Sequence, residues 1–361
     1  MKSAFPLLES SHILICRTDN IGDVVLTLPM VQRLRELVPG ARITLLCRAY
    51  AMDIARLSCA VDDVVALEEI GDDPVAHLRR LAVDTIIFAQ PDKKLALAAF
   101  RAGIPNRVGN ARQKLYLMLF CNRRVRFSKR TSQDHEAQIN FEFLRPFGCN
   151  TIPTREEISG YQHFLLPAPS ADMMQLLDAD HFHVIFHPCS NGHGREWPIG
   201  HFTELARRLG DHGGIKIWLT GSPGEGEWLR ANAPELLAQA HVNDVCGRFS
   251  LAELAIFIDA ADALIASGTG PLHLSGALDQ RTIGLFPPTR PMHPGRWAAL
   301  GRRSINLTSP EENCAHCDSN AGRTCACMAA ITPERVGAIV EQWHKEDAAR
   351  PMHQAALSAV R

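Results

Sequence analysis

Long hydrophobic runs are missing from this 361-residue chain, and none reaches the roughly 18 apolar residues that a membrane-spanning helix requires. Residues 1–12 also lack the apolar stretch of a secretory signal peptide. The net charge of −1 provides no overall positive charge for binding nucleic acid. From these absences we expect a cytoplasmic protein that does not bind nucleic acid.

Two familiar phosphate-binding motifs are absent as well. No Gly-x-Gly-x-x-Gly follows the first apolar stretch, Ile13–Cys16, and no glycine-rich loop ends in Gly-Lys-Ser or Gly-Lys-Thr. The first absence argues against a nicotinamide-dependent dehydrogenase, and the second argues against a P-loop enzyme.

Acidic residues are missing between Asp92 and Asp134, a stretch that we call the basic interval. Its basic residues are Lys93, Lys94, Arg101, Arg107, Arg112, Lys114, Arg123, Arg124, Arg126, Lys129 and Arg130. A charge run of this kind is often only a solvated face of the protein. A field of one sign over this length also suits an anionic partner, such as a phosphorylated glycolipid or a membrane surface.

Short apolar stretches alternate with helical segments along most of the chain. The first series of expected strands covers Ile13–Cys16, Arg42–Cys47, Val61–Val65 and Thr85–Phe88, with a helix over Val24–Leu37. Clustered prolines between Thr151 and Asp180 interrupt the pattern. The second series covers His183–Phe186, Ile215–Leu219, Ala263–Ala266 and Thr282–Phe286.

This alternation is typical of parallel sheets that helices cover on both faces. We predict an α/β protein with two doubly wound, Rossmann-like domains, at 1–165 and 180–345, and a tail at 346–361. In such sheets, ligands bind outside the carboxyl ends of the strands. The two domains are therefore expected to face each other across a binding cleft.

The turn after Ala263–Ala266 carries the strongest signal for a ligand. Ser267, Gly268, Thr269, Gly270 and Pro271 stand between an expected strand and an expected helix that contains Leu274–Leu278. Small residues at such a turn let backbone N–H groups approach an anion, and the helix dipole favours negative charge there. The turn predicts a phosphate site, and His273 either binds the same group or supports the turn.

Other candidate residues also follow expected strands. Asp23 is either a first-turn helix carboxylate or a general base that faces the cleft. Arg195, in the polar loop that starts near Ser190, can hold a diphosphate through two parallel hydrogen bonds. Glu225 is either a ribose ligand or an ordinary first-turn glutamate. Phe249 either borders a nucleobase or belongs to the core.

Eleven cysteines are present, and several lie in strand-like stretches where a buried thiol is the ordinary interpretation. Near the C-terminus, Cys314 and Cys317 form Cys-x-x-Cys, and Cys325 and Cys327 form Cys-x-Cys. These four residues are able to hold a zinc ion that braces a loop. Because Cys-x-Cys is less typical of zinc sites, we leave a structural zinc open and predict no metal or cofactor for the function.

Taken in order, several motifs resemble glycosyltransferase family 9, the heptosyltransferases of lipopolysaccharide core synthesis. The motifs are Gly22–Val24 with Leu28–Pro29, Arg107–Gly109, His135–Glu136, Trp197–Pro198, Gly268–Leu274 and Phe286–Thr289. The sequence departs from the family pattern at Gly268, where several members carry an aspartate, and at Arg195, where they carry a lysine.

The resemblance implies a GT-B fold and an inverting, metal-independent transfer of a sugar, heptose from ADP-heptose, to an anionic lipopolysaccharide-core-type acceptor. It implies that Asp23 is the base. It assigns the donor to Ser190, Arg195, Glu225, Phe249, Thr269, Gly270, Pro271 and His273. We expect Lys93, Arg107 and Arg112 of the basic interval to bind the acceptor, and the enzyme to associate peripherally with the inner membrane.

Two alternatives remain open from the sequence. A nucleotide-sugar epimerase of similar shape would need no acceptor. A non-catalytic protein that only binds a nucleotide sugar would also fit, because the aspartate is missing at Gly268.

Overall fold

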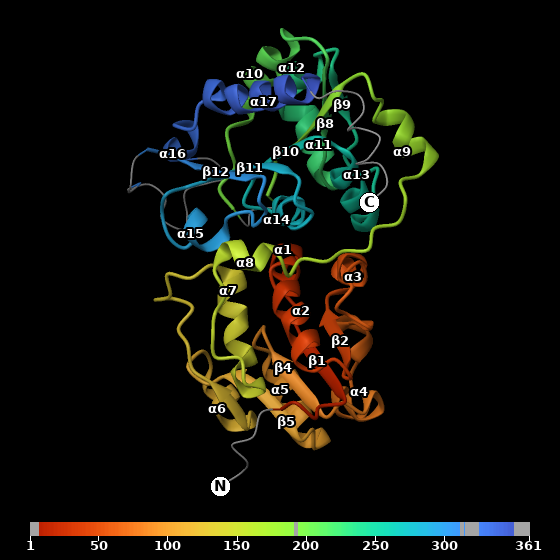
Figure 1. Ribbon diagram of the computed structural model, residues 1–361, viewed down its shortest axis with the longest axis vertical. Helices are drawn as coiled ribbons and strands as arrows, with labels where there is room; N and C mark the ends of the chain where they lie inside the picture. Colours follow the sequence, from red (N-terminus) through yellow and green to blue (C-terminus); the bar gives the residue numbers. More distant parts are fainter. Residues whose placement is uncertain (1–6, 191–193, 311–313, 315–324, 350–361) are drawn as a thin grey trace.

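Each half of the chain is built on a six-stranded parallel sheet (Figure 1). The computed structural model describes residues 7–190, 194–310, 314 and 325–349. The first sheet has the order β3-β2-β1-β4-β5-β6. Its strands are β1 His12–Cys16, β2 Arg42–Cys47, β3 Asp63–Ala66, β4 Thr85–Phe88, β5 Asn106–Asn110 and β6 Arg123–Val125.

The second sheet repeats this winding, with the order β12-β11-β10-β7-β8-β9. Its strands are β7 Phe182–His187, β8 Ile215–Leu219, β9 Val242–Asp244, β10 Ala263–Ser267, β11 Arg281–Phe286 and β12 Ser304–Thr308. The chain reverses its direction of winding between β1 and β4 and again between β7 and β10. These are the points where doubly wound sheets open a crevice for ligands.

Helices cover the sheets on both faces, as the buried, apolar strands require. In the first half they are α1 Ile21–Val25, α2 Leu28–Leu37, η1 Ala49–Ala51, α3 Met52–Arg56, η2 Leu67–Ile70, α4 Pro74–Leu81, α5 Lys93–Ala102, α6 Leu115–Phe120, α7 Glu136–Asn140 and η3 Phe141–Phe147. The segment between the sheets carries α8 Arg155–Ser159 and α9 Ala171–Leu176. In the second half they are α10 Ile199–Gly210, α11 Pro223–Asn232, α12 Pro234–Leu237, α13 Leu251–Ala260, α14 Gly270–Ala277, α15 Pro294–Trp297, α16 Ala326–Ala329 and α17 Pro333–Ala348. None of the helices in the described part of the chain is long and apolar enough to cross a membrane.

The expected helix over Val24–Leu37 is wrong in its bounds, because the structure divides it into α1 and α2. Pro29 has no N–H to donate to the carbonyl of Val25, so a continuous helix would lose that hydrogen bond. Proline is well tolerated in a first turn, and α2 accordingly begins at Leu28. The helix after β10 starts at Gly270, which is earlier than the expected Leu274–Leu278 segment.

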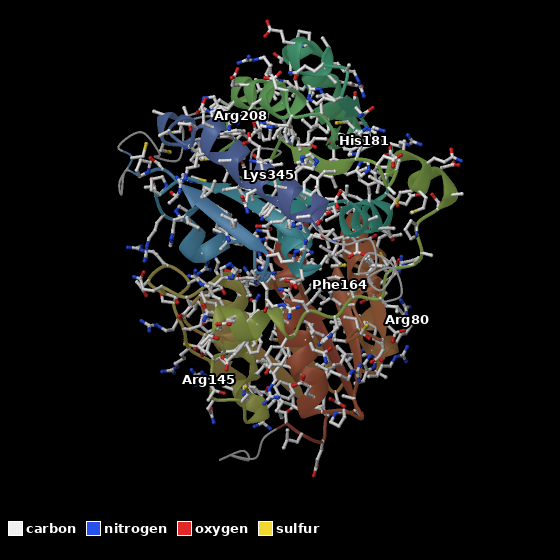
Figure 2. All side chains as sticks on the ribbon, turned by 45° about the horizontal axis from the view of Figure 1, so that its top comes forward. Arg80, Arg145, Phe164, His181, Arg208 and Lys345 are labelled. Carbon is white, nitrogen blue, oxygen red and sulfur yellow. The ribbon has the colours of Figure 1, made fainter. Side chains whose placement is uncertain are left out.

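The two halves share apolar packing. Val25, Ile54 and Leu57 of the first half belong to the same buried cluster as residues of the second half, among them Ile185, Phe257 and Leu272. Phe164, in the segment between the sheets, packs against both this cluster and the core of the first half (Figure 2). Apolar side chains therefore join the two halves.

Candidate active site

A cavity of about 820 Å³ lies between the two halves. Asn20–Asp23, which follow β1, line it from the first half. Residues that follow β7, β8, β10 and β11 line it from the second half. The cavity therefore occupies the place that the reversal of strand order predicts for a ligand.

All the residues that the sequence assigned to the base and the donor line this cavity. They are Asp23, Ser190, Arg195, Glu225, Phe249, Thr269, Gly270, Pro271 and His273. The structure therefore brings together side chains that are up to 250 positions apart in the sequence. Of the residues assigned to the acceptor, none lines the cavity.

The turn between β10 and α14 opens on the cavity through Thr269, Gly270 and Pro271. The backbone is tightly packed here, because a Cβ added at Gly194 would lie 2.8 Å from the carbonyl oxygen of Gly268. The buried hydroxyl of Thr269 has no hydrogen-bond partner among the described residues. The first-turn N–H groups of a helix have no intrahelical partner and carry a partial positive charge. The turn is thus equipped to bind an anion.

The loop that carries Arg195 is fixed by hydrogen bonds on both sides of that residue. Glu196 accepts hydrogen bonds through Oε1 from the backbone N–H of Ser190 (2.7 Å) and from its hydroxyl (3.1 Å). The backbone N–H of Trp197 donates to the hydroxyl of Ser267, at 3.1 Å. Arg195, which is only 8% exposed, is thereby held at the wall of the cavity beside the anion-binding turn.

Glu225 and Phe249 each combine the two interpretations that the sequence left open. Glu225 caps α11, since its Oε2 accepts from the backbone N–H of Ser222 at 2.7 Å, and the same side chain lines the cavity. Phe249 packs on Phe257, with ring centroids 4.7 Å apart, and also lines the cavity. Leu254 lines the same region, so this end of the cavity offers an apolar wall next to a carboxylate.

His273 lies where α14 meets α1. A Cβ added at Gly22 would be 2.7 Å from Cδ2 of His273, so only glycine allows this approach. Burial lowers the pKa of His273 to about 4, although the nearby carboxylate of Asp23 acts in the opposite direction. Its buried Nδ1 has no hydrogen-bond partner among the described residues. A neutral imidazole therefore stands where the two halves meet.

Asp23 is held in place by a buried arginine. Its Oδ1 accepts from Nη2 of Arg17 at 2.5 Å, and its side chain is 14% exposed. Arg17 is fully buried, and its Nε lies 2.9 Å from Oδ1 of Asp19. Burial raises the pKa of Asp19 to about 6 against the opposing effect of Arg17. The Asp23 carboxylate is consequently oriented toward the cavity by a cation that water does not reach.

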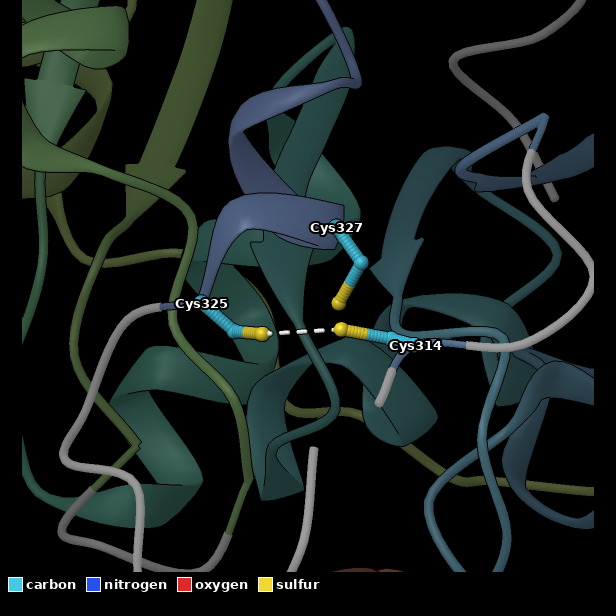
Figure 3. Close-up of side chains that lie close together, drawn as sticks. All are labelled: Cys314, Cys325 and Cys327. Carbon is cyan, nitrogen blue, oxygen red and sulfur yellow. Dashed lines mark hydrogen bonds between the residues drawn. The ribbon is translucent and has the colours of Figure 1, made fainter. Parts of the chain in front are cut away.

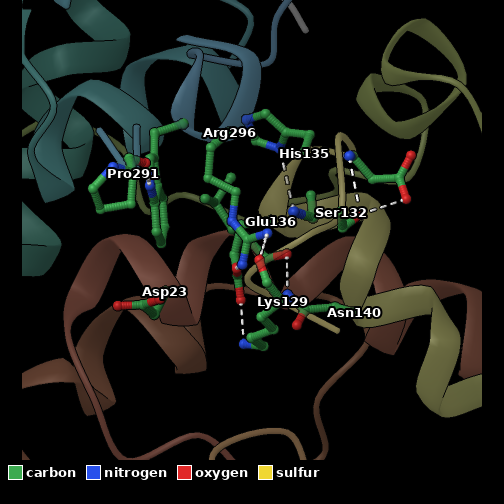
Figure 4. A network of polar contacts seen from close by, with 12 residues as sticks. Asp23, Lys129, Ser132, His135, Glu136, Asn140, Pro291 and Arg296 are labelled. Carbon is green, nitrogen blue, oxygen red and sulfur yellow. Dashed lines mark hydrogen bonds and ion pairs between the residues drawn. The ribbon is translucent and has the colours of Figure 1, made fainter. Parts of the chain in front are cut away.

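Glu136 joins this network to the second half of the chain (Figure 4). Its Oε1 lies 2.6 Å from Nζ of Lys129 and 3.2 Å from Nη2 of Arg17, and its Oε2 pairs with Arg296. Burial alone would raise the pKa of Glu136, but the charges of Lys129, Arg17 and Arg296 outweigh it and lower this pKa to about 2. Burial lowers the pKa of Lys129 against the attraction of Glu136. Arg296 belongs to the second half, so the pair crosses the cleft.

A histidine next to this network also bridges the halves. Nε2 of His135 lies 3.0 Å from the carbonyl oxygen of Ala298, and its Nδ1 accepts from the backbone N–H of Ala137 at 3.2 Å. Both contacts are satisfied by a neutral ring that carries its proton on Nε2. Burial lowers the pKa of His135 to about 3, which agrees with that neutral form.

The residues assigned to the acceptor lie outside the cavity lining. Arg107 donates through Nε to the carbonyl oxygen of Phe120 at 2.7 Å and through Nη1 to that of Ile104. Its guanidinium also lies over the ring of Phe100, 5.5 Å from the centroid, so Arg107 has a packing role in the structure. Lys93, at the start of α5, and Arg112, after β5, are exposed.

Several residues of the site carried no signal that we used in the sequence. Arg48, Tyr50, Met292 and Trp297 line the cavity, yet none of them belongs to a motif named in the sequence. Lys129 was counted only as part of the basic interval, and Arg296 was not singled out. Glu136 lies in the His135–Glu136 motif, and that motif was the one available signal for the ion-pair network.

The fold and the cavity together define a two-domain α/β protein whose ligand cleft lies between facing Rossmann-type sheets. A sequence profile of glycosyltransferase family 9 (heptosyltransferase) matches residues 75–326. The chain therefore belongs to glycosyltransferase family 9: it is a glycosyltransferase with the GT-B fold.

Individual relatives cover nearly the whole chain. Lipopolysaccharide heptosyltransferase 1 of Salmonella typhimurium is 27% identical over 330 residues, which are 86% of this chain and 98% of the relative. The structure of E. coli ADP-heptose lipopolysaccharide heptosyltransferase II superposes with a TM-score of 0.71 at 18% identity, covering 94% of this chain and 100% of that one. A family 9 glycosyltransferase of Veillonella parvula superposes with a TM-score of 0.74 at 17% identity, covering 93% and 97%.

Proposed function

We propose that this glycosyltransferase transfers heptose from ADP-heptose to an anionic acceptor of the lipopolysaccharide-core type, with inversion and without a metal ion. The names of the relatives support the donor and the pathway. The observation that carries the reaction is the single cavity in which Asp23 of the first half faces the anion-binding turn of the second.

The donor occupies the second half in this proposal. Phe249 and Leu254 provide an apolar wall for the adenine, and Glu225 accepts a hydrogen bond from a ribose hydroxyl. The diphosphate lies at the N-terminus of α14, where Thr269 and the guanidinium of Arg195 reach it. The hydroxyl of Thr269 supports this placement, because it has no hydrogen-bond partner within the described part of the chain and buried polar atoms are normally hydrogen-bonded.

The acceptor hydroxyl attacks the anomeric carbon from the side of the first half. Asp23 takes the proton of that hydroxyl as the new C–O bond forms. The bond between the anomeric carbon and the diphosphate oxygen breaks, and ADP leaves with the electron pair. A single displacement of this kind inverts the anomeric configuration.

Negative charge grows on the departing diphosphate, and the second half stabilises it electrostatically. Arg195 and the N-terminus of α14 are positioned before the reaction, and such preorganised groups are usually the largest contribution to catalysis. Among the described residues, the only cluster of three or more side chains suited to hold a metal ion lies outside the cavity. Arg195 and the N-terminus of α14 therefore stabilise the charge of the departing diphosphate without a metal ion.

The base is tested with Asp23→Asn, assayed for transfer from ADP-heptose to a lipopolysaccharide-core acceptor. Loss of a general base lowers turnover by about 10²–10⁴-fold. ADP binding should stay within a few-fold of the unmodified protein, because the donor contacts lie in the other half. Asp53→Asn is the matched control, since Asp53 is also a first-turn carboxylate of the first half. Near-normal turnover by Asp23→Asn would overturn the assignment.

The donor is tested by thermal stabilisation with nucleotides. A ligand at 100 times its dissociation constant adds about 2.7 kcal/mol to the free energy of unfolding. We expect ADP and ADP-heptose to stabilise the protein more than UDP or GDP compounds do. A preference for UDP would contradict the donor, and product formed without an acceptor would contradict the transfer reaction.

We further propose that the surface of the basic interval binds the anionic surface of a membrane, where an acceptor glycolipid resides. Helix α6 exposes Leu115 (69%) and Leu119 (62%), and α5 exposes Phe100 (51%). Exposed apolar side chains next to lysine and arginine are typical of surfaces that lie on anionic lipid. Lys93 and Arg112 then bind the acceptor's anionic groups from this side.

The membrane proposal predicts cosedimentation with vesicles that contain anionic lipid and not with purely zwitterionic vesicles. A Leu115→Ser, Leu119→Ser double variant should bind several-fold less, whereas Leu165→Ser, another exposed leucine, should leave binding unchanged. Equal binding to both kinds of vesicle would refute the charge-based proposal.

A further inference from the structure

Three cysteine side chains converge in the second half, away from the cavity. Cys314 follows β12, Cys325 caps the N-terminus of α16, and Cys327 lies within α16. Their sulfur atoms all lie within 4.8 Å of one another, and the Sγ atoms of Cys314 and Cys325 are 3.3 Å apart (Figure 3). Two separate segments of chain therefore bring three thiols to one point.

The spacing of these sulfur atoms fits a shared metal ion. Thiolates that bind one tetrahedral zinc ion at ~2.3 Å lie ~3.8 Å from each other. A disulfide would join only two of the three sulfurs at ~2.05 Å and would leave the third unexplained. Tetrahedral thiolate sites select zinc or iron among the common metals.

We propose that Cys314, Cys325 and Cys327 bind one zinc ion as a structural site. The fourth cysteine of this part of the sequence, Cys317, lies outside the described residues, and the experiment below examines it separately. Zinc is the expected ion because a structural thiolate site that is remote from substrate needs no redox chemistry.

The position of the site indicates what the ion stabilises. Cys327 is buried in the same apolar cluster as Trp197, and Cys314 and Cys325 pack against that cluster. The indole N–H of Trp197 donates to the carbonyl oxygen of Ile331, at 2.7 Å, just after α16. An ion at the three cysteines thus fixes α16. Because Trp197 contacts the chain just after this helix, α16 in turn supports the loop that carries Arg195, the residue two positions before Trp197. None of the three cysteines lines the cavity, so the ion takes no part in the transfer itself.

The proposal is tested by elemental analysis of the full-length protein, purified without chelators. We expect about one zinc per chain. Cys314→Ser and Cys325→Ser should each lose most of it, while Cys246→Ser, a half-buried cysteine elsewhere in the same half, should retain it. Loss of the metal in Cys317→Ser would identify the fourth ligand, and retention would show that the three described thiolates suffice.

Two measurements on the unmodified protein keep the test independent of whether the variants fold. Replacement of zinc by Co²⁺ should give the strong visible absorption of tetrahedral thiolate coordination, and a thiol-specific mercurial should release the metal. An unreduced protein with a Cys314–Cys325 disulfide, or one without any bound metal, would overturn the site. Iron at one per chain would overturn the assignment of zinc. Because none of these readouts involves activity, a failure of the proposed reaction would leave them unaffected.

Discussion

Replacement of Glu136 by glutamine would remove the carboxylate that three cations share. Arg17 is fully buried, and the side chains of Arg296 and Lys129 are only 11% and 20% exposed. Glutamine has nearly the same shape, so packing is retained. Its amide nitrogen would instead face a guanidinium or an ammonium group. The cost of Glu136→Gln therefore comes from charge, since no cavity is formed.

The magnitude follows from the pKa of Glu136, which is about 2 in the folded protein against an ordinary value of 4.5. At about 1.36 kcal/mol per pKa unit, the environment favours the ionised form by about 3 kcal/mol. Breaking a buried ion pair by removing one partner generally costs about 3–5 kcal/mol. We expect Glu136→Gln to lower the free energy of unfolding by about 3 kcal/mol at neutral pH.

The assay is urea unfolding at several pH values. Because the folded pKa is depressed, the contribution of Glu136 is complete above pH 4.5 and is lost as the pH falls toward 2. The difference between the unmodified protein and Glu136→Gln should therefore be largest near pH 7 and should shrink below pH 4.5.

Glu36→Gln provides the control for this measurement. Glu36 also pairs with an arginine, Arg33, but both side chains are more than one third exposed. Surface pairs of this kind contribute at most about 1 kcal/mol. If Glu136→Gln changed stability no more than Glu36→Gln, or if its effect were the same at every pH, the reasoning from buried charge would be refuted.

Three further substitutions have expected outcomes. Gly22→Ala should lower the free energy of unfolding by about 1–3 kcal/mol in urea, because its Cβ would meet His273; unchanged stability would contradict the close approach. Thr269→Val should leave stability unchanged and weaken ADP binding by about 0.5–1.5 kcal/mol in calorimetry, because its hydroxyl has no described partner. Trp197→Phe should cost about 1–3 kcal/mol by orphaning the carbonyl of Ile331, whereas a smaller loss would show that water replaces the indole.

The sequence predicted the central strands of both sheets because those strands are continuous apolar runs. It missed β5, β6, β9 and β12, which contain polar residues such as Arg107, Asn243 and Asn306 and whose pattern resembles a loop. β6, β9 and β12 are edge strands, which tolerate polar side chains because one side of such a strand has no neighbouring strand. β5 lies inside the sheet, between β4 and β6, but Val108 is its one large apolar residue. Periodicity alone therefore could not distinguish these strands from connections.

The donor side of the site was more predictable than the acceptor side. Thr269 follows β10 closely, and Arg195 stands in the loop after β7, so the topology of the fold gives their location. Arg17 and Lys129 meet Glu136 through the folding of the first half, and Arg296 reaches it only when the two halves face each other. No local pattern in the sequence predicts that these distant side chains come into contact. The assignment of Lys93, Arg107 and Arg112 to an acceptor stays a prediction: none of the three lines the cavity, and Arg107 donates hydrogen bonds to backbone carbonyls.

The ion pair between Glu136 and Arg296 limits how this enzyme can be recombined with its relatives. The two sheets are wound separately, so an exchange of whole halves between family members is an obvious route to hybrid enzymes with new acceptors. A hybrid that takes Glu136 from one parent and a neutral residue at the position of Arg296 from the other would bury a network with unbalanced charge at the junction. Compatibility of the halves is thus decided at a few charged positions, and exchanging both partners together should restore it.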